Sequence, residues 1–560
     1  MDNYEIADQL SLLSKLMDIH GENSFKSKSY ASAAFTLEKL PNSIIDLSKE
    51  KICGIRGIGE SVGNKVVEII ETGELKSLKE LIEKTPEGVL EMMNIKGLGP
   101  KKIHTIWKEL NISSINELRK ACEQNLIAEK KGFGEKTQQN ILSSISFRQE
   151  NKGKYLYAQI DAFAQALLSK LNQKFTKFKT GISGAYRRQL EVIEELEFVT
   201  SIPKDKLLQF FKEDEFALIS ESNMLVEIVA NDAVKLKFHL ADEDNFSSIF
   251  FKTSCSPEFL FSFKNTFQWN ENEKISSEKE IFSKNNLNYI PPFLREKETI
   301  ISKAKENNFE NVIQTSEIKG LIHSHSNWSD GAYTIDQMVE ELIALGFEYL
   351  VISDHSKAAF YANGLSEQKI KEQHKYIDEL NKKYAPFKIF KSIECDILND
   401  GAMDYSNEIL STFDLVIASI HSNLDMPEEK AMKRLLGAIS NPYVTILGHM
   451  TGRVLLRRKG YPVDYKTIID ACAENNVVIE INASPSRLDM NWNWIDYALE
   501  KNVVLSIDPD AHSLDEFHSI KWGVAVAQKG GLTKENNLSS FSLTEFEEFL
   551  KVTRLKKGIN

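Results

Sequence analysis

Two histidines stand one residue apart in the segment LIHSHSNWSDG, residues 321–331, and an aspartate follows them. Side chains two positions apart on a β strand point to the same side, so His323 and His325 would converge on one point. Imidazole and carboxylate groups are the ligands that transition-metal ions take in proteins. The segment therefore predicts part of a metal site, with Asp330 in the turn as a further candidate ligand.

Later apolar runs end in residues of the same types. Each run is predicted to be a strand, and the residues that end these strands are His355, Glu394, His421, His449, Asp510 and His512. The runs alternate with helical stretches, as in βα units, and the active sites of (β/α) barrels form where the strands end. Any one of these histidines alone would be better explained by a structural role. Six of the chain's 11 histidines in such positions instead favour an active site.

The length of 560 residues predicts two to four domains that position these side chains. The first residues lack the pattern of a signal peptide, and no run of about 18 apolar residues occurs, so we expect a cytoplasmic protein without membrane contact. Five scattered cysteines without a CxxC pair predict reduced thiols and no disulfide framework. The net charge of −12 argues against a protein that coats nucleic acid nonspecifically.

Three short segments near the start share one design: residues 54–70 (GIRGIGESVGNKVVEII), 94–107 (NIKGLGPKKIHTIW) and 129–142 (EKKGFGEKTQQNIL). In each, a Gly–apolar–Gly hairpin leads into a helix that carries a lysine, which is the helix–hairpin–helix motif. Glycine allows close approach of the backbone to a phosphate, and free N–H groups at a helix start face the anion. A C-cap glycine would explain one copy, but three copies predict binding to the DNA backbone without base readout. The predicted contacts are Gly57, Gly59, Lys65, Gly97, Gly99, Lys101, Gly132, Gly134 and Lys136.

The middle of the chain resembles the palm of the family X DNA polymerases, in particular the bacterial PolX type. The similarity is carried by SGAYRRQLEVIEELEFVTS (183–201) after the hairpin repeats, and by YIPPFLRE (289–296), and it covers residues 1 to about 315. In that family a Gly-Ser-x-Arg-Arg segment precedes an Asp-x-Asp pair, and a third aspartate lies on a later strand. The three carboxylates hold two Mg²⁺ ions for nucleotidyl transfer.

The residues at these polymerase positions depart from the family. The aspartate pair is replaced by Glu195 and Glu197, and Lys237 stands where the third aspartate belongs, although nearby Asp232 leaves another register open. Mg²⁺ demands near-ideal octahedral geometry, and an ammonium group repels it. Gly184-Ala185 replaces the Gly-Ser pair of the family, and KTSCS (252–256) stands where the family has a Tyr-Phe-containing platform for the incoming nucleotide. A degenerate polymerase site is therefore predicted. Arg187 and Arg188 remain, either to hold DNA or as solvated surface residues.

The C-terminal half resembles the PHP (polymerase and histidinol phosphatase) domain, which follows the polymerase region in PolX proteins. The resemblance implies one metal ion at His323, His325 and Asp510, a second at His421 and His449 with Glu394 bridging, and a third at Asp330, His355 and His512. Leu321 replaces an aspartate that is not a ligand. The ligand types suit Mn²⁺, Zn²⁺ or Fe²⁺. Arg487, in INASPSRLDM, either holds a phosphate oxygen or is an exposed loop residue.

These inferences predict a multidomain fold. We expect a helical helix–hairpin–helix region with lyase-like (1–85) and fingers-like (86–150) domains, a degenerate α+β palm and thumb (151–315), and a distorted (β/α) barrel of PHP type (316–560). The catalytic candidates are Glu394, Asp330 and Arg487.

The expected function is DNA repair by a 3′→5′ exonuclease on gapped, nicked or end-containing DNA, with two to three divalent ions and an inactive polymerase site. The hairpins could also hold a monovalent cation, and a nucleoid-associated monomer is favoured. The alternatives are an active family X polymerase with secondary exonuclease activity and a phosphatase for small phosphate esters. The complete ligand set disfavours a noncatalytic DNA scaffold.

Overall fold

The computed structural model of the chain describes residues 3–38, 40, 43–45, 47–95, 97–212, 216–230, 234–267, 269–270 and 274–559. The chain divides into two compact units, residues 1–152 and 153–560. All five cysteines are free thiols. Among the helices of the described residues, none is long and apolar enough to cross a membrane.

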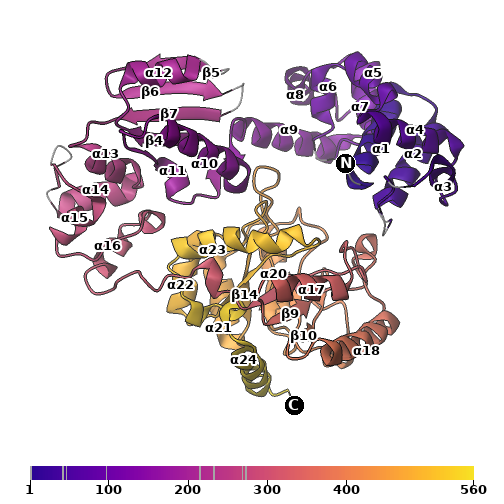
Figure 1. Ribbon diagram of the computed structural model, residues 1–560. Coiled ribbons are helices and arrows are strands. Elements are labelled where there is room, and N and C mark those ends of the chain that lie inside the picture. Colours follow the sequence, from indigo (N-terminus) through magenta and orange to yellow (C-terminus); the bar gives the residue numbers. More distant parts are fainter. Residues whose placement is uncertain are drawn as a thin grey trace. The chain divides into compact units, whose positions relative to one another are not determined.

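The unit of residues 1–152 is built of helices (Figure 1). Its α helices are α1 (Asn3–His20), α2 (Ser24–Glu38), α3 (Lys49–Cys53), α4 (Glu60–Thr72), α5 (Lys76–Lys84), α6 (Glu87–Met92), α7 (Pro100–His104), α8 (Ile115–Glu123) and α9 (Gly134–Glu150). A π-helical turn, η1 (Thr105–Glu109), continues α7. One continuous apolar core extends from Ile6 in α1 to Ile145 in α9, so the two predicted N-terminal domains share a core.

Each of the three hairpins is anchored by its middle residue. Ile58, Leu98 and Phe133 are buried in the apolar core of this unit. The glycines on either side can then remain at the surface while the apolar side chain fixes the turn. Helices α4 and α7 start directly after the second glycine of their hairpins, and Pro100 occupies the first position of α7, where no N–H is needed.

The first part of the second unit contains a five-stranded sheet with the order β2-β4-β7-β6-β5. Its strands are β2 (Thr180–Ile182), β4 (Glu195–Thr200), β5 (Phe216–Glu221), β6 (Leu225–Ala230) and β7 (Val234–Leu240). Strands β4 and β7 are parallel, and the other neighbours are antiparallel. Helices α10 (Tyr157–Lys174) and α12 (Lys204–Lys212) share an apolar core with the sheet, in which Phe198 stacks on Phe238. A short ribbon of β1 (Tyr155–Leu156) and β3 (Val192–Ile193), together with α11 (Gly184–Arg187), completes this part.

Alternation along β7 separates two faces of this sheet. Leu236 and Phe238 are buried, whereas Lys237 and His239 lie on the opposite, partly exposed face. The period of two that a strand imposes therefore places the charged residues of β7 beside those of its parallel neighbour β4. A small helical part follows, with α13 (Phe246–Thr253), α14 (Pro257–Thr266), α15 (Glu278–Ser283) and α16 (Thr299–Lys303) around a separate apolar cluster.

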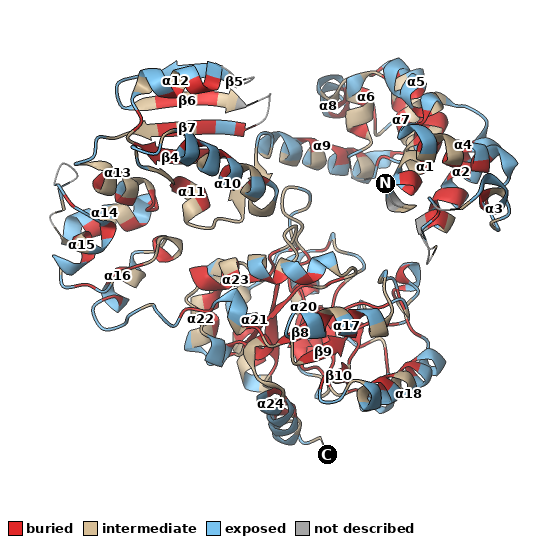
Figure 2. Cartoon of the chain, in the orientation of Figure 1, coloured by how far each residue is buried: buried red, intermediate tan, exposed pale blue. Residues whose placement is uncertain are grey.

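The last part of the chain alternates strands and helices. Its strands are β8 (Gly320–Ser324), β9 (Tyr349–Ile352), β10 (Lys388–Lys391), β11 (Glu394–Asp396), β12 (Ile417–Ser419), β13 (Ile446–Leu447), β14 (Val478–Asn482) and β15 (Leu505–Asp508). Its α helices are α17 (Ile335–Ala344), α18 (Glu367–Lys383), α19 (Asn407–Leu410), α20 (Glu428–Ile439), α21 (Tyr465–Asn475), α22 (Ile495–Glu500), α23 (Ile520–Lys529) and α24 (Leu543–Lys556). Figure 2 shows buried residues in β8, β9 and β10 beneath the more exposed helices.

The strands of this part form two parallel sheets, with the orders β10-β9-β8 and β11-β12-β13-β14-β15. Single bridges join the two sheets, from Ser324 of β8 to Ala511 after β15 and from His355 after β9 to Glu394 of β11. All strand residues of β8, β9, β11 and β14 are buried, as expected where a parallel sheet is covered on both faces.

Candidate metal centre

Histidine and carboxylate side chains gather at the carboxyl ends of the parallel strands. His323 lies near the end of β8, and the others follow strands or begin the next one: His325, Asp330, His355, Glu394, His421, His449, Asp510 and His512. Because neighbouring strands are parallel, their carboxyl ends meet at the same end of the sheets. The structure thus brings together all nine side chains that the sequence singled out as ligands.

The Glu394 carboxylate lies at the centre of the cluster and is completely buried. Its Oε1 atom is 3.3 Å from Nε2 of His323, 3.0 Å from Nε2 of His421 and 2.9 Å from Nε2 of His449. Its Oε2 atom is 2.9 Å from Nδ1 of His355. One carboxylate therefore faces imidazoles from both of its oxygens, which is the geometry of a bridging ligand.

The ligand atoms fall into three groups, in each of which they lie within 4.8 Å of one another. These groups are His323, His325, Glu394 and Asp510; His325, Asp330, His355 and His512; and His355, Glu394 and His421. The first two contain the sets that the resemblance implied, with His325 common to both. The third contains His355 in place of the expected His449, whose Nε2 atom contacts Glu394 instead.

Several buried atoms of the cluster lie near oppositely charged or polar groups but form no hydrogen bond of good geometry among the described residues. They include Nε2 of His323, Nδ1 of His325, Nδ1 of His355 and Oε2 of Glu394. A buried polar atom without a partner costs about 1–3 kcal/mol, so native structures rarely leave several together. A divalent cation would satisfy lone pairs of this kind, and the donor set of imidazole nitrogen and carboxylate oxygen fits such an ion.

Burial and charge oppose each other in this cluster. Burial acts to lower the pKa of His323, but the carboxylates of Glu480 and Asp510 outweigh it and raise the pKa well above its ordinary value. Burial acts to raise the pKa of Glu394, but His421 and His323 outweigh it and lower the pKa well below its ordinary value. The carboxylates therefore remain charged and require compensating positive charge, which protons on the imidazoles or bound cations can supply.

His325 differs from its neighbour in protonation. Burial and the nearby His512 and His355 lower the pKa of His325 well below its ordinary value. Its Nε2 atom lies 3.1 Å from Oδ1 of Asp510. His325 is thus held in the neutral form, which is the form that ligates a metal ion.

Three residues of the site were not predicted from the sequence. Oε2 of Glu480, in β14, lies 2.5 Å from Nδ1 of His323, and Oε1 of Glu480 accepts a hydrogen bond from the backbone N–H of His449. Asn482 donates to Oδ2 of Asp510, and Asp396 lies 3.3 Å from Nδ1 of His421. Such groups orient metal ligands and tune their basicity. A carboxylate inside the otherwise apolar run VVIEI was the signal that could have identified Glu480.

Arg487 lies beside the cluster, in the loop after β14. Its Nε atom is 3.9 Å from Oδ2 of Asp510, and its side chain is 24% exposed. The guanidinium group is thus at the edge of the site and accessible to a ligand, as the sequence prediction of a phosphate contact requires.

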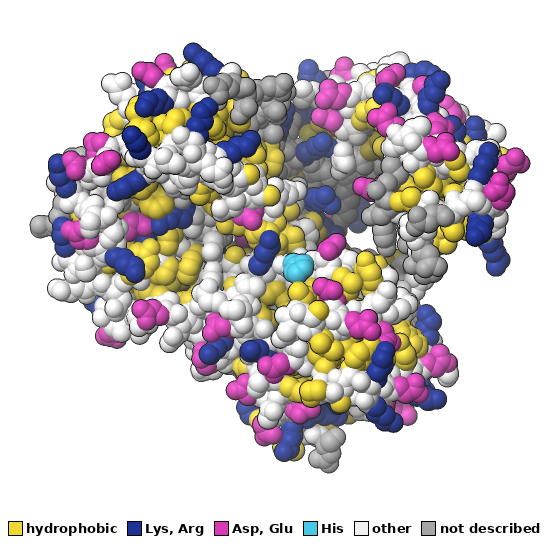
Figure 3. Space-filling model, in the orientation of Figure 1, with side chains coloured by type: hydrophobic (Ala, Val, Ile, Leu, Met, Phe, Trp, Pro, Cys, Tyr) yellow, Lys and Arg dark blue, Asp and Glu magenta, His cyan; other side chains and the backbone are white. Residues whose placement is uncertain are grey.

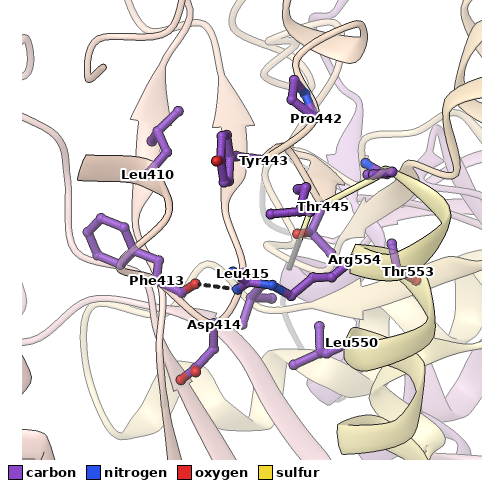
Figure 4. Close-up of a pocket in the computed structure, with 12 residues that line it drawn as sticks. Leu410, Phe413, Asp414, Leu415, Pro442, Tyr443, Thr445, Leu550, Thr553 and Arg554 are labelled. Atoms are coloured by element: carbon purple, nitrogen blue, oxygen red, sulfur yellow. Dashed lines mark hydrogen bonds between the residues drawn. The ribbon is translucent and has the colours of Figure 1, made fainter. Parts of the chain in front are cut away.

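A hollow of a different kind lies at the opposite ends of the strands (Figure 4). Leu415 and Thr445 line it and lie just before β12 and β13 in the chain. The Nη1 atom of Arg554 in α24 donates to the Phe413 carbonyl. Metal-ligating types are almost absent from its lining, and residues at this end of a parallel strand layer serve stability. Catalysis is therefore expected only at the carboxyl ends.

Five of the six hairpin glycines border open space, whereas a Cβ added at Gly57 would meet Oγ1 of Thr36 at 3.1 Å. Gly57, Gly97 and Gly132 have φ values of 96°, 88° and 94°, in the region that favours glycine. A Cβ added at Gly59, Gly97, Gly99, Gly132 or Gly134 would meet nothing within 4 Å. Basic and acidic side chains are interspersed on the face of this unit that Figure 3 shows.

The lysines that accompany the hairpins differ in their surroundings. Lys65 pairs with Glu68 at 2.7 Å, whereas Lys101 and Lys136 stand in the first turns of α7 and α9. The third hairpin also differs, because α9 begins at Gly134 itself, with a φ of 69°.

The palm positions form ion pairs on the sheet. Strands β4 and β7 align Glu197 with Lys237, whose Nζ atom is 3.2 Å from Oε1 of Glu195. Nε2 of His239 lies 2.8 Å from Oε2 of Glu197. Burial acts to lower the pKa of Lys237, but Glu195 and its neighbours outweigh it and raise the pKa, so the ammonium stays charged. Asp232, the other candidate, lies outside the described residues.

Arg187 and Arg188 form ion pairs within the fold, and their role in holding DNA stays a prediction. Arg187 pairs with Glu278 and donates to Oγ of Ser254, and Arg188 pairs with Glu296 at 2.9 Å. Both guanidinium groups are mostly buried, so neither arginine is a solvated surface residue. Lys529 of α23 also contacts Glu296, at 3.0 Å.

The segment KTSCS joins two helices. Ser254 and Cys255 are buried between α13 and α14, and Ser256 caps the start of α14. Residues 252–256 therefore present no aromatic surface for an incoming nucleotide.

Three protein families match the chain. A helix-hairpin-helix domain matches residues 1–75, a SAM-like helix-hairpin-helix tandem matches residues 89–146, and a PHP domain matches residues 322–484. These matches confirm the predicted helix–hairpin–helix region at the start of the chain and the predicted PHP domain in its C-terminal half.

Full-length similarity is found with the DNA polymerase/3′-5′ exonuclease PolX of Bacillus subtilis (strain 168). The two sequences are 31% identical over 571 residues, which cover 98% of this chain and 100% of the relative. A probable phosphatase of Thermoanaerobacter sp. (strain X514) is 28% identical over 42% of this chain and 96% of its own length. The probable phosphatase YcdX of Escherichia coli O81 (strain ED1a) is 33% identical over 17% of this chain and 38% of its own length.

Proposed function

Because the chain belongs to the PolX family of DNA polymerase/3′-5′ exonucleases, we propose that it is a DNA-binding, metal-dependent phosphodiesterase that removes nucleotides from DNA 3′ ends during repair. The resemblance predicted from the sequence is confirmed at the level of the family. The observation that carries the proposal is the contrast between the two sites. The candidate metal centre has buried ligand atoms without a well-formed hydrogen bond, whereas the polymerase site contains a charged lysine.

We assign residues 316–560 to the phosphodiesterase domain, a distorted (β/α) barrel, because two single bridges join its two parallel sheets to each other. One ion would be held by His323, His325 and Asp510, and another by His421 and His449, with Glu394 shared between them. A third would be held by Asp330, His355 and His512. Mn²⁺ is favoured, and Zn²⁺ or Fe²⁺ would also fit these ligands.

Bound ions of this kind supply a hydroxide near neutral pH and neutralise charge on a phosphodiester. The protein supplies orientation. Glu394 holds both sides of the cluster together, and Arg487 is placed to bind a phosphate oxygen of the substrate. Asp330, whose side chain is 32% exposed, lies on the open side of the cluster, where a substrate would enter.

The polymerase site of residues 151–315 is proposed to be inactive. Glu195 and Glu197 remain on β4, but Lys237 neutralises the first and His239 contacts the second. The ammonium beside the Glu195 carboxylate repels a divalent cation at this site. The absence of an aromatic platform at residues 252–256 supports the same conclusion.

DNA binding is assigned to the hairpins of the first unit. The backbone at Gly97, Gly99 and Gly132 faces open space, so a phosphate could approach it without displacing protein atoms. Contacts of this type read the shape and charge of the backbone and carry no base sequence information. Gapped or nicked DNA and DNA ends are therefore the proposed ligands.

A labelled primer–template incubated with the protein, Mn²⁺ and nucleotides tests the proposal directly. Shortening of the primer that disappears in a His323→Ala/His325→Ala variant is expected. Primer growth that disappears on Glu197→Ala would instead establish the polymerase as the main activity.

Phosphatase action on small phosphate esters is a second candidate function. It is favoured by the probable phosphatase that matches 42% of this chain over nearly its whole length. Comparing kcat/KM for a labelled oligonucleotide and for p-nitrophenyl phosphate separates the two, since a nuclease should strongly prefer the oligonucleotide.

A further inference from the structure

Two aromatic side chains project from the loop that follows the metal-ligand candidate His355. Phe360 is 84% exposed and Tyr361 is 63% exposed. Their ring centroids are 6.0 Å apart, with the ring planes at 77°. Adjacent exposed aromatic residues lose hydrophobic stabilisation, and such surfaces commonly bind a ligand.

The loop that carries these residues is fixed to the metal centre at both ends. The N–H of Ser356 donates to the Glu394 carbonyl at 3.0 Å, and the N–H of Leu365 donates to the His355 carbonyl at 2.8 Å. Asn363 donates from its side chain to the Ser329 carbonyl, next to Asp330. The aromatic pair therefore has a defined position relative to three candidate metal ligands.

Further hydrogen bonds hold the start of the same loop. The N–H of Lys357 donates to the hydroxyl of Tyr405, and the N–H of Ala358 donates to Oδ2 of Asp404 at 2.7 Å. A loop with so many fixed backbone groups has little entropy left to lose when a ligand binds.

The charged groups of the site act on the Tyr361 hydroxyl. Partial burial and the negative charges of Asp396 and Glu394 raise its pKa to about 12, and the Arg487 guanidinium acts in the opposite direction. The hydroxyl is thus within electrostatic range of both the carboxylates and Arg487. A phosphate held by Arg487 would have Tyr361 as a neighbour.

A second guanidinium group, that of Arg458, is carried by a loop that contacts the loop of Arg487. Burial and the positive charge of Arg487 lower the pKa of Arg458, which donates from Nε and Nη2 to the Gly452 carbonyl. The loops that carry these two arginines are bonded to each other, from the N–H of Leu455 to the Ser486 carbonyl. Two like charges held close together favour an anion between them.

We propose that Phe360 and Tyr361 form a stacking platform for the terminal nucleobases of a DNA strand whose phosphates lie along Arg487 and Arg458. This proposal rests on the proposed nuclease function and adds the element that distinguishes a nucleic-acid strand from a small phosphate ester. Every nucleobase has a face that can stack on an aromatic ring, so the platform would accept any sequence.

The test compares the protein with a Phe360→Ala/Tyr361→Ala variant on a short single-stranded oligonucleotide in Mn²⁺. The KM of the variant is expected to rise about 10-fold to 100-fold, as loss of base stacking implies, with kcat nearly unchanged. Leu555→Ala is the matched control, because Leu555 is also exposed but lies in α24, away from the carboxyl ends of the strands. Phe360→Trp/Tyr361→Phe, which keeps both aromatic faces, should retain the original KM.

An oligonucleotide with abasic residues at its 3′ end provides the second arm. The unmodified protein should have a raised KM on this abasic substrate. The alanine variant should have the same KM on it as the unmodified protein. Equal KM values for the alanine variant and the unmodified protein on the normal oligonucleotide would refute the platform. If both proteins cleave the oligonucleotide in that experiment, the proposed nuclease function still stands.

Photo-crosslinking supplies a readout that does not depend on cleavage. An oligonucleotide ending in iododeoxyuridine is irradiated with the full-length protein in Ca²⁺, and the modified peptide is identified by mass spectrometry. Crosslinks within residues 356–365 are expected. Crosslinks confined to other segments would refute the platform, even if the protein proved to have no nuclease activity.

Discussion

Removal of the positive charge at Lys237 should be necessary, together with restoration of both aspartates, before the palm can bind catalytic metal. The Nζ atom of Lys237 is 3.2 Å from the Glu195 carboxylate, and both side chains are less than one third exposed. Two unit charges about 4 Å apart interact by about 4 kcal/mol at the effective dielectric near a protein surface, and a divalent ion doubles this figure. A penalty of about 4 kcal/mol alone corresponds to roughly a thousandfold loss of metal affinity.

The pKa of Lys237 excludes a simple rescue by pH. The folded protein raises this pKa above the ordinary value of 10.5. The ion-pair stabilisation is therefore complete below that value and is lost only as the pH rises through the still higher pKa of the folded state. A polymerase assay at neutral or mildly alkaline pH leaves the ammonium charged, so we expect no synthesis at any of these pH values.

The assay is primer extension in Mg²⁺ and in Mn²⁺, on a His323→Ala/His325→Ala background that prevents primer degradation. We expect no primer extension by the His323→Ala/His325→Ala parent protein, and none after Glu195→Asp/Glu197→Asp is added to it. Measurable extension should require Lys237→Asp as well, and it also requires that residues 252–256 allow a nucleotide to bind. Lys237→Met is the control, because it removes the charge without supplying a ligand. Extension by the parent, or full rescue by the two aspartates alone, would refute the reasoning.

Three further outcomes are expected. The His323→Ala/His325→Ala variant should lose nuclease activity but keep its DNA affinity in a gel-shift assay, because the hairpins lie in the other unit. Cleavage at the wild-type rate would contradict the assignment of these histidines as metal ligands. Residues 1–152, which have their own core, should bind DNA with an affinity that falls steeply between about 50 and 200 mM salt. The double substitution Gly57→Val/Gly59→Val should lower this affinity further. An affinity that changes with neither salt nor substitution would show that the hairpins have a structural role only. Glu480→Gln should raise the Mn²⁺ concentration for half-maximal activity about 10-fold to 100-fold, because it weakens the partner of His323, and an unchanged activation curve would show that this partner is dispensable.

The residues at the carboxyl ends of the strands could be predicted because apolar runs mark the strands and a residue of a metal-ligand type ends each run. The loops after β9, β12, β13 and β15 bring these residues to the same end of parallel sheets. His323 and His325 do not converge through strand alternation, because β8 ends at Ser324, its pairing with β9 is irregular between Leu321 and Ser324, and the backbone of His323 has a φ of 58°. Which ligands share an ion depends on side-chain positions across strands, and no spacing within one segment reports this. The structure accordingly groups His355 with Glu394 and His421, where the resemblance had implied His449.

The partners of buried charges could not be predicted from local sequence. Arg187 pairs with Glu278, and Arg188 with Glu296, in each case about a hundred residues away along the chain. Glu480 was missed because a carboxylate inside a strand resembles an exposed residue until the neighbouring strands are placed. The contact of His239 with Glu197 depends on the register of β4 against β7. Hydrophobic patterning predicts which face of the sheet a side chain lies on, but it does not predict this register.

The polymerase site and the candidate metal centre both balance the charge of neighbouring carboxylates, but with different cationic side chains. Each gathers carboxylates that repel one another, at Glu195 and Glu197 on the palm and at Glu394 and Asp510 in the cluster. Lysine compensates the charge in the palm, and a charged ammonium has no lone pair to offer a metal ion. Histidine compensates it in the cluster, and an imidazole that releases its proton becomes a ligand. Metal binding can therefore replace protons at one site without rearrangement, whereas at the other it must first expel a side chain.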